Sequence, residues 1–199
     1  MLRANDRMPR IVHRRESLVS EGDDLRILAV ADTHGRPHPA LGERIRELGP
    51  GHILHAGDVG DPAVLRALEA YAPVTAVRGN IDGRDWPDRV TIDVCHGGRT
   101  WLTILLTHIA VNGTKLRADV ARCARAEEAS IVVCGHSHVP FAARDAGTIV
   151  FNPGSSGPRR FRLPIVLGVI DVSQEAASVH HIDCETGLRW KPDSGSLRP

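Results

Sequence analysis

Aromatic residues are scarce in this 199-residue chain, in which Phe, Trp and Tyr together make up 4% of the sequence. So few rings argue against the stacking platforms on which proteins bind single-stranded nucleic acids. Charge of one sign is not in excess either, because 25 basic residues stand against 24 acidic ones. Without an overall field to attract a polyanion, we expect no stable complex with nucleic acid.

Long apolar runs are missing as well. No stretch reaches the roughly 18 residues that a membrane span needs, and the basic N-terminus lacks the apolar segment of a secretory signal. The four cysteines show no CxxC spacing and lie in apolar surroundings, as expected for small buried thiols in a reducing compartment. These absences predict a cytoplasmic protein that makes no membrane contact.

The length and a hydrophobic content of 42% suit one globular domain. We expect a loosely ordered extension over residues 1–24, the domain over 25–185, and a tail over 186–199 that is rich in Gly, Pro and Ser. Short β-branched runs alternate with helical patterns inside the domain. The first half is typical of βαβαβ with buried parallel strands, and the second half of antiparallel pairing. This pattern predicts one α/β domain with two sheets.

The expected elements follow from these patterns. Strands are predicted over residues 26–32, 52–58, 74–80, 89–94, 100–108, 130–136, 139–144, 148–152, 164–172 and 178–184. Helices are predicted over residues 40–48, 61–71 and 114–128.

Five of the apolar runs end in residue types that bind metal ions. In open α/β sheets, ligands bind at the carboxyl ends of the strands, so these side chains are expected to converge on one rim. Imidazole nitrogen and carboxylate oxygen together suit Mn, Fe, Zn, Co or Ni. The residues are Asp32, His34, Asp58, Asn80, His108, His136 and His138.

Seven ligands exceed what one ion normally takes from a protein. They fit two ions that share a bridging carboxylate about 3.5–4 Å apart. Two simpler explanations exist: strand ends often carry Asp, Asn and Gly for turn reasons, and an isolated HxH such as 136–138 is more often a polar turn. Five such ends in succession favour the metal centre.

Six short polar segments follow one another along the chain: DTHG (32–35), GDVGD (57–61), GNID (79–82), TH (107–108), GHSH (135–138) and NPGS (152–155). In this order and spacing they resemble the motifs of the calcineurin-like metallophosphoesterases. The closest resemblance is to the small single-domain branch, which includes bacterial and archaeal phosphodiesterases and the retromer scaffold subunit. It covers about residues 25–172. The resemblance implies a four-layer αββα sandwich of two mixed β-sheets flanked by helices, with a dimetal site on loops at one sheet edge.

The resemblance also implies a role for each residue. The expected ligands are Asp32, His34 and His138 for a first ion, Asp58 as the bridge, and Asn80, His108 and His136 for a second ion. The two histidines of GHSH would therefore serve different ions. The implied cofactor is two divalent metal ions, with Mn favoured and Fe, Zn, Ni or Co as alternatives.

The implied activity is hydrolysis of a small phosphoester, foremost a phosphodiester. A hydroxide that bridges the two ions would attack phosphorus in line with the leaving oxygen. Asp58, Asn80 and His108 are the expected catalytic residues. The composition leaves a homo-oligomer open.

Two positions depart from the family pattern. Larger members carry a histidine after the Asn of the GN motif, which protonates the leaving group or steadies the phosphoryl oxygens, and Ile81 can do neither. Ile109 stands where the family usually has Gly, which leaves His108 in place and affects the loop that follows. Ile81 keeps a rival function open: a non-catalytic protein-binding scaffold with a silent or structural metal site.

Four further residues each have two interpretations. His55 is either a neighbour of Asp58 that supports the metal site or a core histidine bonded to backbone. Arg78 either orients phosphate or pairs with a carboxylate. Arg159 and Arg160 form either a basic lip on the site or a solvated loop.

Overall fold

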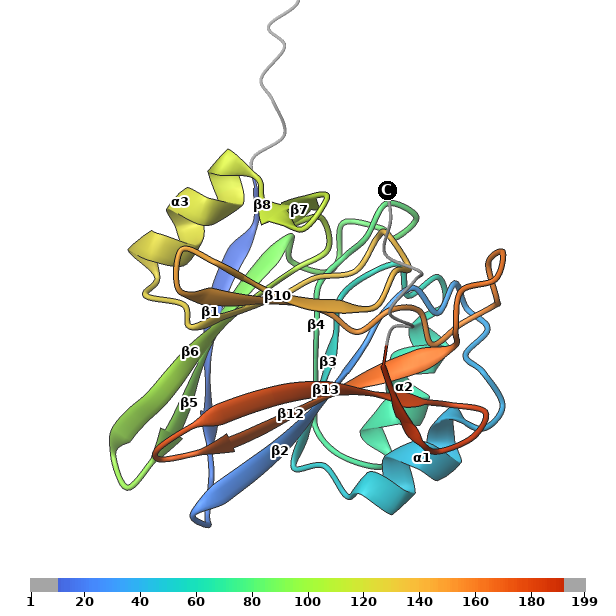
Figure 1. Ribbon diagram of the computed structural model, residues 1–199, viewed down its shortest axis with the longest axis horizontal. Coiled ribbons are helices and arrows are strands. Elements are labelled where there is room, and N and C mark those ends of the chain that lie inside the picture. The colour runs from blue at the N-terminus through green and yellow to red at the C-terminus, as the bar shows by residue number, and fades with distance from the viewer. Residues whose placement is uncertain (1–10, 192–199) are drawn as a thin grey trace, which may run out of the picture.

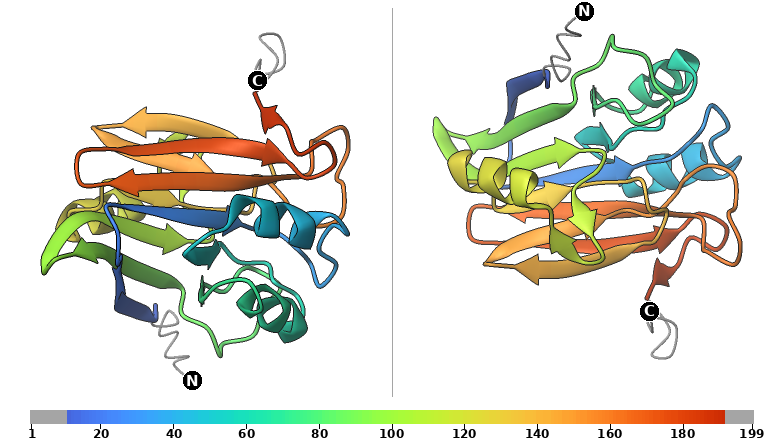
Figure 2. Two further views of the ribbon diagram at one scale, coloured as in Figure 1. Left: turned by 90° about the horizontal axis from the view of Figure 1, so that it is seen from below. Right: turned by 90° about the horizontal axis from the view of Figure 1, so that it is seen from above.

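Two six-stranded sheets pack face to face, and three helices lie on their outer faces (Figures 1 and 2). The computed structural model describes residues 11–191. The expectations for residues 1–10 and 192–199 lie outside the described residues. The arrangement is the four-layer αββα sandwich of two mixed sheets that the motifs imply, and the α/β assignment is confirmed.

The first sheet has the strand order β1-β5-β6-β9-β11-β10. Its strands are β1 (His13–Val19), β5 (Arg89–His96), β6 (Arg99–Thr107), β9 (Ile131–Val133), β10 (Phe141–Asp145) and β11 (Thr148–Asn152). Strand β9 runs parallel to both of its neighbours, while β5 and β6 form an antiparallel pair. This sheet is therefore mixed.

The second sheet has the order β14-β13-β12-β2-β3-β4. Its strands are β2 (Asp24–Val30), β3 (His52–His55), β4 (Val74–Ala76), β12 (Val166–Ser173), β13 (Ala177–Asp183) and β14 (Arg189–Trp190). The strands β2, β3 and β4 are parallel, and β12 joins them antiparallel to β2. The predicted parallel first half and more antiparallel second half are thus observed in this sheet.

The helices are α1 (Leu41–Leu48), α2 (Pro62–Glu69) and α3 (Ala118–Ala126). The Asp61 side chain caps α2 by accepting a hydrogen bond from the Ala63 N–H, with proline in the first turn. The helix expected from residue 114 begins only at 118. A short hairpin of β7 (Val111–Asn112) and β8 (Lys115–Leu116) occupies the preceding residues, and Gly113 adopts the positive φ of its turn.

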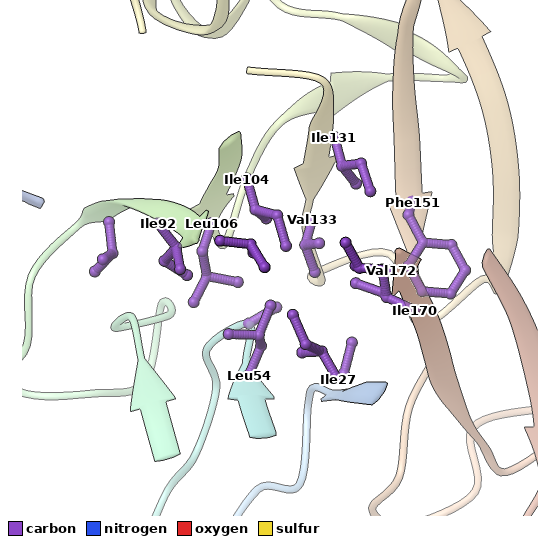
Figure 3. Close-up of a cluster of buried hydrophobic side chains, with 14 of the residues drawn as sticks. Ile27, Leu54, Ile92, Ile104, Leu106, Ile131, Val133, Phe151, Ile170 and Val172 are labelled. Carbon is purple, nitrogen blue, oxygen red and sulfur yellow. The ribbon is translucent and has the colours of Figure 1, made fainter. Parts of the chain in front are cut away.

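Alternating side chains of the central strands divide the interior into separate apolar layers. In β2, Ile27 and Ala29 face the cluster between the sheets, while Leu28 and Val30 face the cluster beneath α1 and α2. Figure 3 shows the inner cluster, in which Phe151 lies beside Ile170. A third cluster lies under α3. Because both sheets are covered on both faces, their central strands hold a rigid edge for the loops.

The N-terminal segment differs from the expectation of a loosely ordered extension. Residues 13–19 form β1, which pairs in parallel with β5 along its whole length. Leu18 packs against the inner cluster, and Arg15 binds Asp93 and Glu127. The charged residues on the outer face hide the strand pattern in the sequence, so the prediction for residues 13–19 is wrong. The expected tail likewise contains β14, which pairs with β13.

Among residues 11–191, no helix combines the length and the apolar character that crossing a membrane requires.

The packing of β1 predicts a difference between two neighbouring substitutions. Leu18→Ala should lower the free energy of unfolding by about 1–2 kcal/mol, because a half-buried leucine costs less than a fully buried one. Val19→Ala, at a side chain that is 73% exposed, should change it by less than about 0.5 kcal/mol. Unfolding in guanidinium chloride measures both values. Equal, near-zero effects would contradict an ordered β1.

Candidate metal centre

Polar side chains follow five strands at the edge where the carboxyl ends of those strands meet. Three of the strands, β2, β3 and β4, belong to one sheet, and β6 and β9 belong to the other. Asp32 and His34 follow β2, Asp58 follows β3, Asn80 follows β4, His108 follows β6, and His136 and His138 follow β9. The centre therefore lies across the ends of both sheets.

A first cluster consists of Asp32, His34 and His138, which bring ligand atoms within 4.8 Å of one another. The Nε2 atom of His138 lies 3.5 Å from Asp32 Oδ1 and 3.4 Å from His34 Nε2. Burial lowers the pKa of His138 to about 4, so the ring is neutral near pH 7. Its Nδ1 is buried and has no hydrogen-bond partner among the described residues, which native interiors rarely tolerate. These donors fit a divalent cation.

A second cluster consists of Asp32, Asp58 and His108. His108 donates from Nδ1 to the carbonyl of Ala56 at 2.7 Å, and this bond leaves Nε2 facing the cluster. His108 Nε2 lies 3.5 Å from Asp58 Oδ1 and 3.1 Å from Asn80 Oδ1. Imidazole, carboxylate and amide oxygen therefore meet at a second point beside the first.

Asp32 is a member of both clusters, and Asp58, a member of the second, also faces the first. The Oδ1 of Asp58 lies 3.5 Å from His108 Nε2, and its Oδ2 lies 3.7 Å from His34 Nε2. The Ile81 N–H donates to Oδ1 at 3.1 Å and fixes the orientation of the carboxylate. One oxygen on each side is the arrangement expected of a carboxylate that bridges two ions.

His136 lies at the rim of the centre. Its side chain is exposed, and its ring meets the His108 ring edge-on with the centroids 5.3 Å apart. The His136 backbone N–H donates to the carboxylate of Asp32 at 3.1 Å. The structure thus brings six of the predicted residues into close contact and places the seventh beside His108.

The acidic groups have different electrostatic environments. Burial raises the pKa of Asp32 to about 7. Burial also acts to raise the pKa of Asp58, but the hydrogen bond and charge of His108 outweigh it, so this pKa lies below its ordinary value. Burial acts to lower the pKa of His108, whereas its bonds to Asp58 and the Ala56 carbonyl raise it above the usual range. The centre holds protons that a cation would displace.

Backbone strain is concentrated at the same residues. Eight non-glycine residues among the described ones have a positive φ, and five of them belong to the predicted set. These five are Asp32, His34, Asp58, His136 and His138, with φ between 47° and 71°. Such conformations cost roughly 1–3 kcal/mol each and gather at functional sites.

Residues outside the predicted set hold the loops of the centre in place. Asp82 accepts hydrogen bonds from the N–H groups of Val59, Gly60 and Gly79 and ties two loops together. A Cβ on Gly79 would lie 2.2 Å from the Asp58 nitrogen, so this close approach requires glycine. The three hydrogen bonds of Asp82 join loops that are distant in the sequence, so they could not be predicted from the sequence.

His55 and Arg78 both have hydrogen-bond partners inside the protein. His55 is completely buried, and its Nδ1 accepts a hydrogen bond from the Gly57 N–H. Its Nε2 lies 3.0 Å from Thr33 Oγ1, and burial lowers its pKa to about 4. His55 is thus a core histidine whose partners stand next to Asp32, His34 and Asp58 in the sequence. Arg78 pairs with Asp88 at 2.7 Å, so its charge is already compensated.

Asn152 holds the GHSH segment in place through side-chain hydrogen bonds. Its Nδ2 donates to the Gly135 carbonyl at 2.7 Å and to Ser137 Oγ at 3.1 Å. Its Oδ1 accepts from the Gly154 N–H, as expected for a tight turn in NPGS.

A separate group of potential ligands, His13, Cys123 and Glu127, lies between β1 and α3. His13 Nε2 is bonded to Thr91 Oγ1, and Arg15 donates to Glu127. Because His13 Nε2 and the Glu127 carboxylate already have partners, we assign no metal to this group.

Comparisons with known proteins agree with this geometry. Residues 25–175 match the family model described as the calcineurin-like phosphoesterase superfamily domain. The chain is similar to the probable metallophosphoesterase YsnB of Bacillus subtilis, with 29% identity over 168 residues that cover 80% of this chain and 91% of that protein. The strand β1 lies outside the matched residues.

Two solved structures show the same fold. One is a conserved uncharacterized protein of Streptococcus pneumoniae TIGR4, described as a predicted phosphoesterase, with a TM-score of 0.60 and 20% identity over 84% of this chain and 96% of that one. The other is vacuolar protein sorting 29 from Cryptosporidium parvum, with a TM-score of 0.68 and 16% identity over 84% and 95% of the two chains.

The position of Asp58 between the clusters predicts a large effect of Asp58→Asn. The substitution keeps the size of the side chain and removes the charge that faces both clusters. We expect metal affinity to fall by more than about 100-fold, beyond the 10- to 100-fold typical of residues that only support ligands. Calorimetric titration with Mn²⁺ measures the loss. The control is Asp85→Asn at an exposed residue nearby, and equal affinities of the two variants would refute the bridging position.

The raised pKa of Asp32 predicts that metal binding depends on pH. A bound cation requires the ionised carboxylate, so each pH unit below about 7 should weaken the affinity by up to about tenfold. The raised pKa of His108 acts in the same direction. The affinity should level off above pH 8 or so. Titration of EDTA-treated protein in two buffers that differ in ionisation enthalpy would detect the released proton, and a pH-independent affinity would count against it.

Proposed function

This chain belongs to the calcineurin-like phosphoesterase superfamily, and from that premise we propose that it is a phosphodiesterase that works with two divalent ions. The observation that most supports this proposal is that the two oxygens of Asp58 face His34 and His108, which belong to different clusters. We propose that the enzyme acts in the cytoplasm on a small phosphoester. Mn²⁺ is the favoured ion, with Fe, Zn, Ni or Co as alternatives, because the ligands mix oxygen and imidazole.

Two divalent ions, when bound, supply an activated water and positive charge for the phosphoryl oxygens. The residues of the chain hold that arrangement in place. Asp58 spans both positions, and the Ile81 N–H fixes its orientation. His108 is locked by the Ala56 carbonyl, and Asn80 lies against it. The first cluster supplies Asp32, His34 and His138 on the other side.

The chemistry of the thiols supports water as the attacking group. Burial raises the pKa of Cys134 and of Cys184 to about 12. Thiols that stay protonated at neutral pH are poor nucleophiles. Neither cysteine therefore competes with a water-based mechanism.

A cavity beside the second cluster supports a diester substrate. It has a volume of about 290 Å³ and includes Asn80 and His108 in its wall. Ile11 and Ile109 add apolar surface, and the Arg78–Asp88 pair adds a polar side. Such a cavity gives room for an ester group beyond the phosphorus.

The rival function is a non-catalytic scaffold on the same fold. It is favoured by the fold similarity to vacuolar protein sorting 29 and by the exposed Ile81, whose side chain is 53% accessible. A scaffold does not need five strained ligand residues, because the strain would have no function to maintain it. Turnover separates the two hypotheses.

The proposed function predicts metal-dependent turnover of an aryl phosphodiester. After EDTA treatment, the protein should not hydrolyse bis(p-nitrophenyl) phosphate, and added Mn²⁺ should restore hydrolysis. The Asp58→Asn variant is the control for contaminating activity. Metal-loaded protein without turnover beyond that variant would favour the scaffold.

Ile81 predicts a steep dependence on the leaving group. General acid catalysis is worth about 10²- to 10⁴-fold, and isoleucine cannot donate a proton. Aryl diesters should therefore react well and alkyl diesters poorly, with log kcat/KM falling as the pKa of the leaving alcohol rises. Ile81→His should flatten that slope. A flat dependence in the wild type, with chemistry shown to limit the rate, would mean that another group protonates the leaving oxygen.

A further inference from the structure

Arg160 lies against the candidate centre. It belongs to residues 157–164, the loop that connects β11 to β12 after the NPGS segment. Its Nη2 donates to His34 Nε2 at 3.1 Å. After burial, the positive charge of Arg160 is the largest influence that lowers the pKa of His138. The guanidinium therefore lies beside the first cluster.

The neighbouring arginine has a different environment. Arg159 is paired with Glu185 and donates to the Leu163 carbonyl at 2.9 Å. Within residues 11–191, no carboxylate lies at ion-pair distance from Arg160, and its polar contact is the His34 ring. Of two adjacent arginines, one is neutralised by a carboxylate and the other is held uncompensated at the site.

The positive charge of Arg160 would lie beside the charges of the bound metal ions. Two divalent ions would bring four positive charges to a centre with the two carboxylates Asp32 and Asp58, and Arg160 would add one more. Arg160 is an exposed residue, so water screens part of this repulsion, but its guanidinium still lies 3.1 Å from the His34 ring. Asp82 adds a third negative charge near His34, which still leaves two positive charges in excess, and an anionic ligand would offset that excess.

The contact with His34 is compatible with this role. A ring nitrogen has one lone pair, so His34 Nε2 cannot both bind an ion and accept from Arg160. Ion binding would therefore free N–H groups of the guanidinium at the side of the centre. Guanidinium groups are suited to phosphoryl oxygens because their donors form a planar fork.

We propose that Arg160 binds a non-bridging phosphoryl oxygen of the substrate at the His34 side of the centre. It supplies positive charge in a site where Ile81 supplies none. This inference rests on the proposed function. Arginine does not give up its proton near neutral pH, so Arg160 stabilises charge and leaves the leaving-group dependence steep.

The test compares Arg160→Ala with Arg160→Lys and with the matched control Arg159→Ala. Calorimetry on Mn²⁺-loaded protein measures the Kd of inorganic phosphate, and elemental analysis measures bound metal. Arg160→Ala should weaken phosphate binding about 10- to 100-fold, as expected for one charge-assisted contact. Bound metal should stay unchanged. Arg160→Lys should recover part of the loss, and Arg159→Ala should stay within about twofold of the wild type.

Kinetics give the second readout. For Arg160→Ala, kcat/KM should fall by the same factor for good and poor aryl leaving groups, which gives a line parallel to that of the wild type. A steeper line would place Arg160 on the leaving oxygen and would overturn the proposal. Unchanged phosphate affinity in Arg160→Ala, or loss of metal from it, would overturn it as well.

The two failures are distinguishable. Phosphate binding that depends on Arg160, in a wild type that hydrolyses no diester, would support the anion site and refute the phosphodiesterase. Turnover in the wild type with phosphate affinity equal in Arg160→Ala and Arg159→Ala would support the phosphodiesterase and refute the anion site.

Discussion

The carboxylate of Asp58, with one oxygen toward each histidine cluster, is the constraint on which the centre depends. Its position is over-determined by the backbone around it. The Ile81 N–H binds one oxygen, and Gly79 lies so close that no side chain fits there. Asp82 ties the loop of Gly79 to the loop that follows Asp58. These contacts hold the charge of Asp58 between the two clusters of candidate ligands.

The packed sheets hold the strained backbone around Asp58 in place. Five of the predicted ligand residues adopt left-handed backbone conformations at strand ends, and such strain persists only where the surrounding structure enforces it. The strands beneath them are buried on both faces, by the other sheet on one side and by helices on the other. A rigid double sheet therefore aligns five separate loops. The local backbone preferences of these residues alone would not favour their left-handed conformations.

Much of this arrangement could be predicted from the sequence, because strand periodicity and strand-end residues are local signals. The convergence of Asp32, Asp58 and His108 followed from the rule that ligands bind at the carboxyl ends of strands. The strand β1 was missed because Arg15 and its outward neighbours carry charges that pair across the surface. The different environments of Arg159 and Arg160 were also hidden, since they depend on Glu185 and His34, which are distant in the sequence.

Anomalous diffraction from crystals grown with Mn²⁺ tests the central claim most directly. If Asp58 bridges two ions, two manganese peaks should lie about 3.5–4 Å apart, with the carboxylate of Asp58 touching both. His34 and His138 should contact one peak, and Asn80 and His108 the other. A single peak, or a pair of peaks that Asp58 does not join, would contradict the bridging position of Asp58.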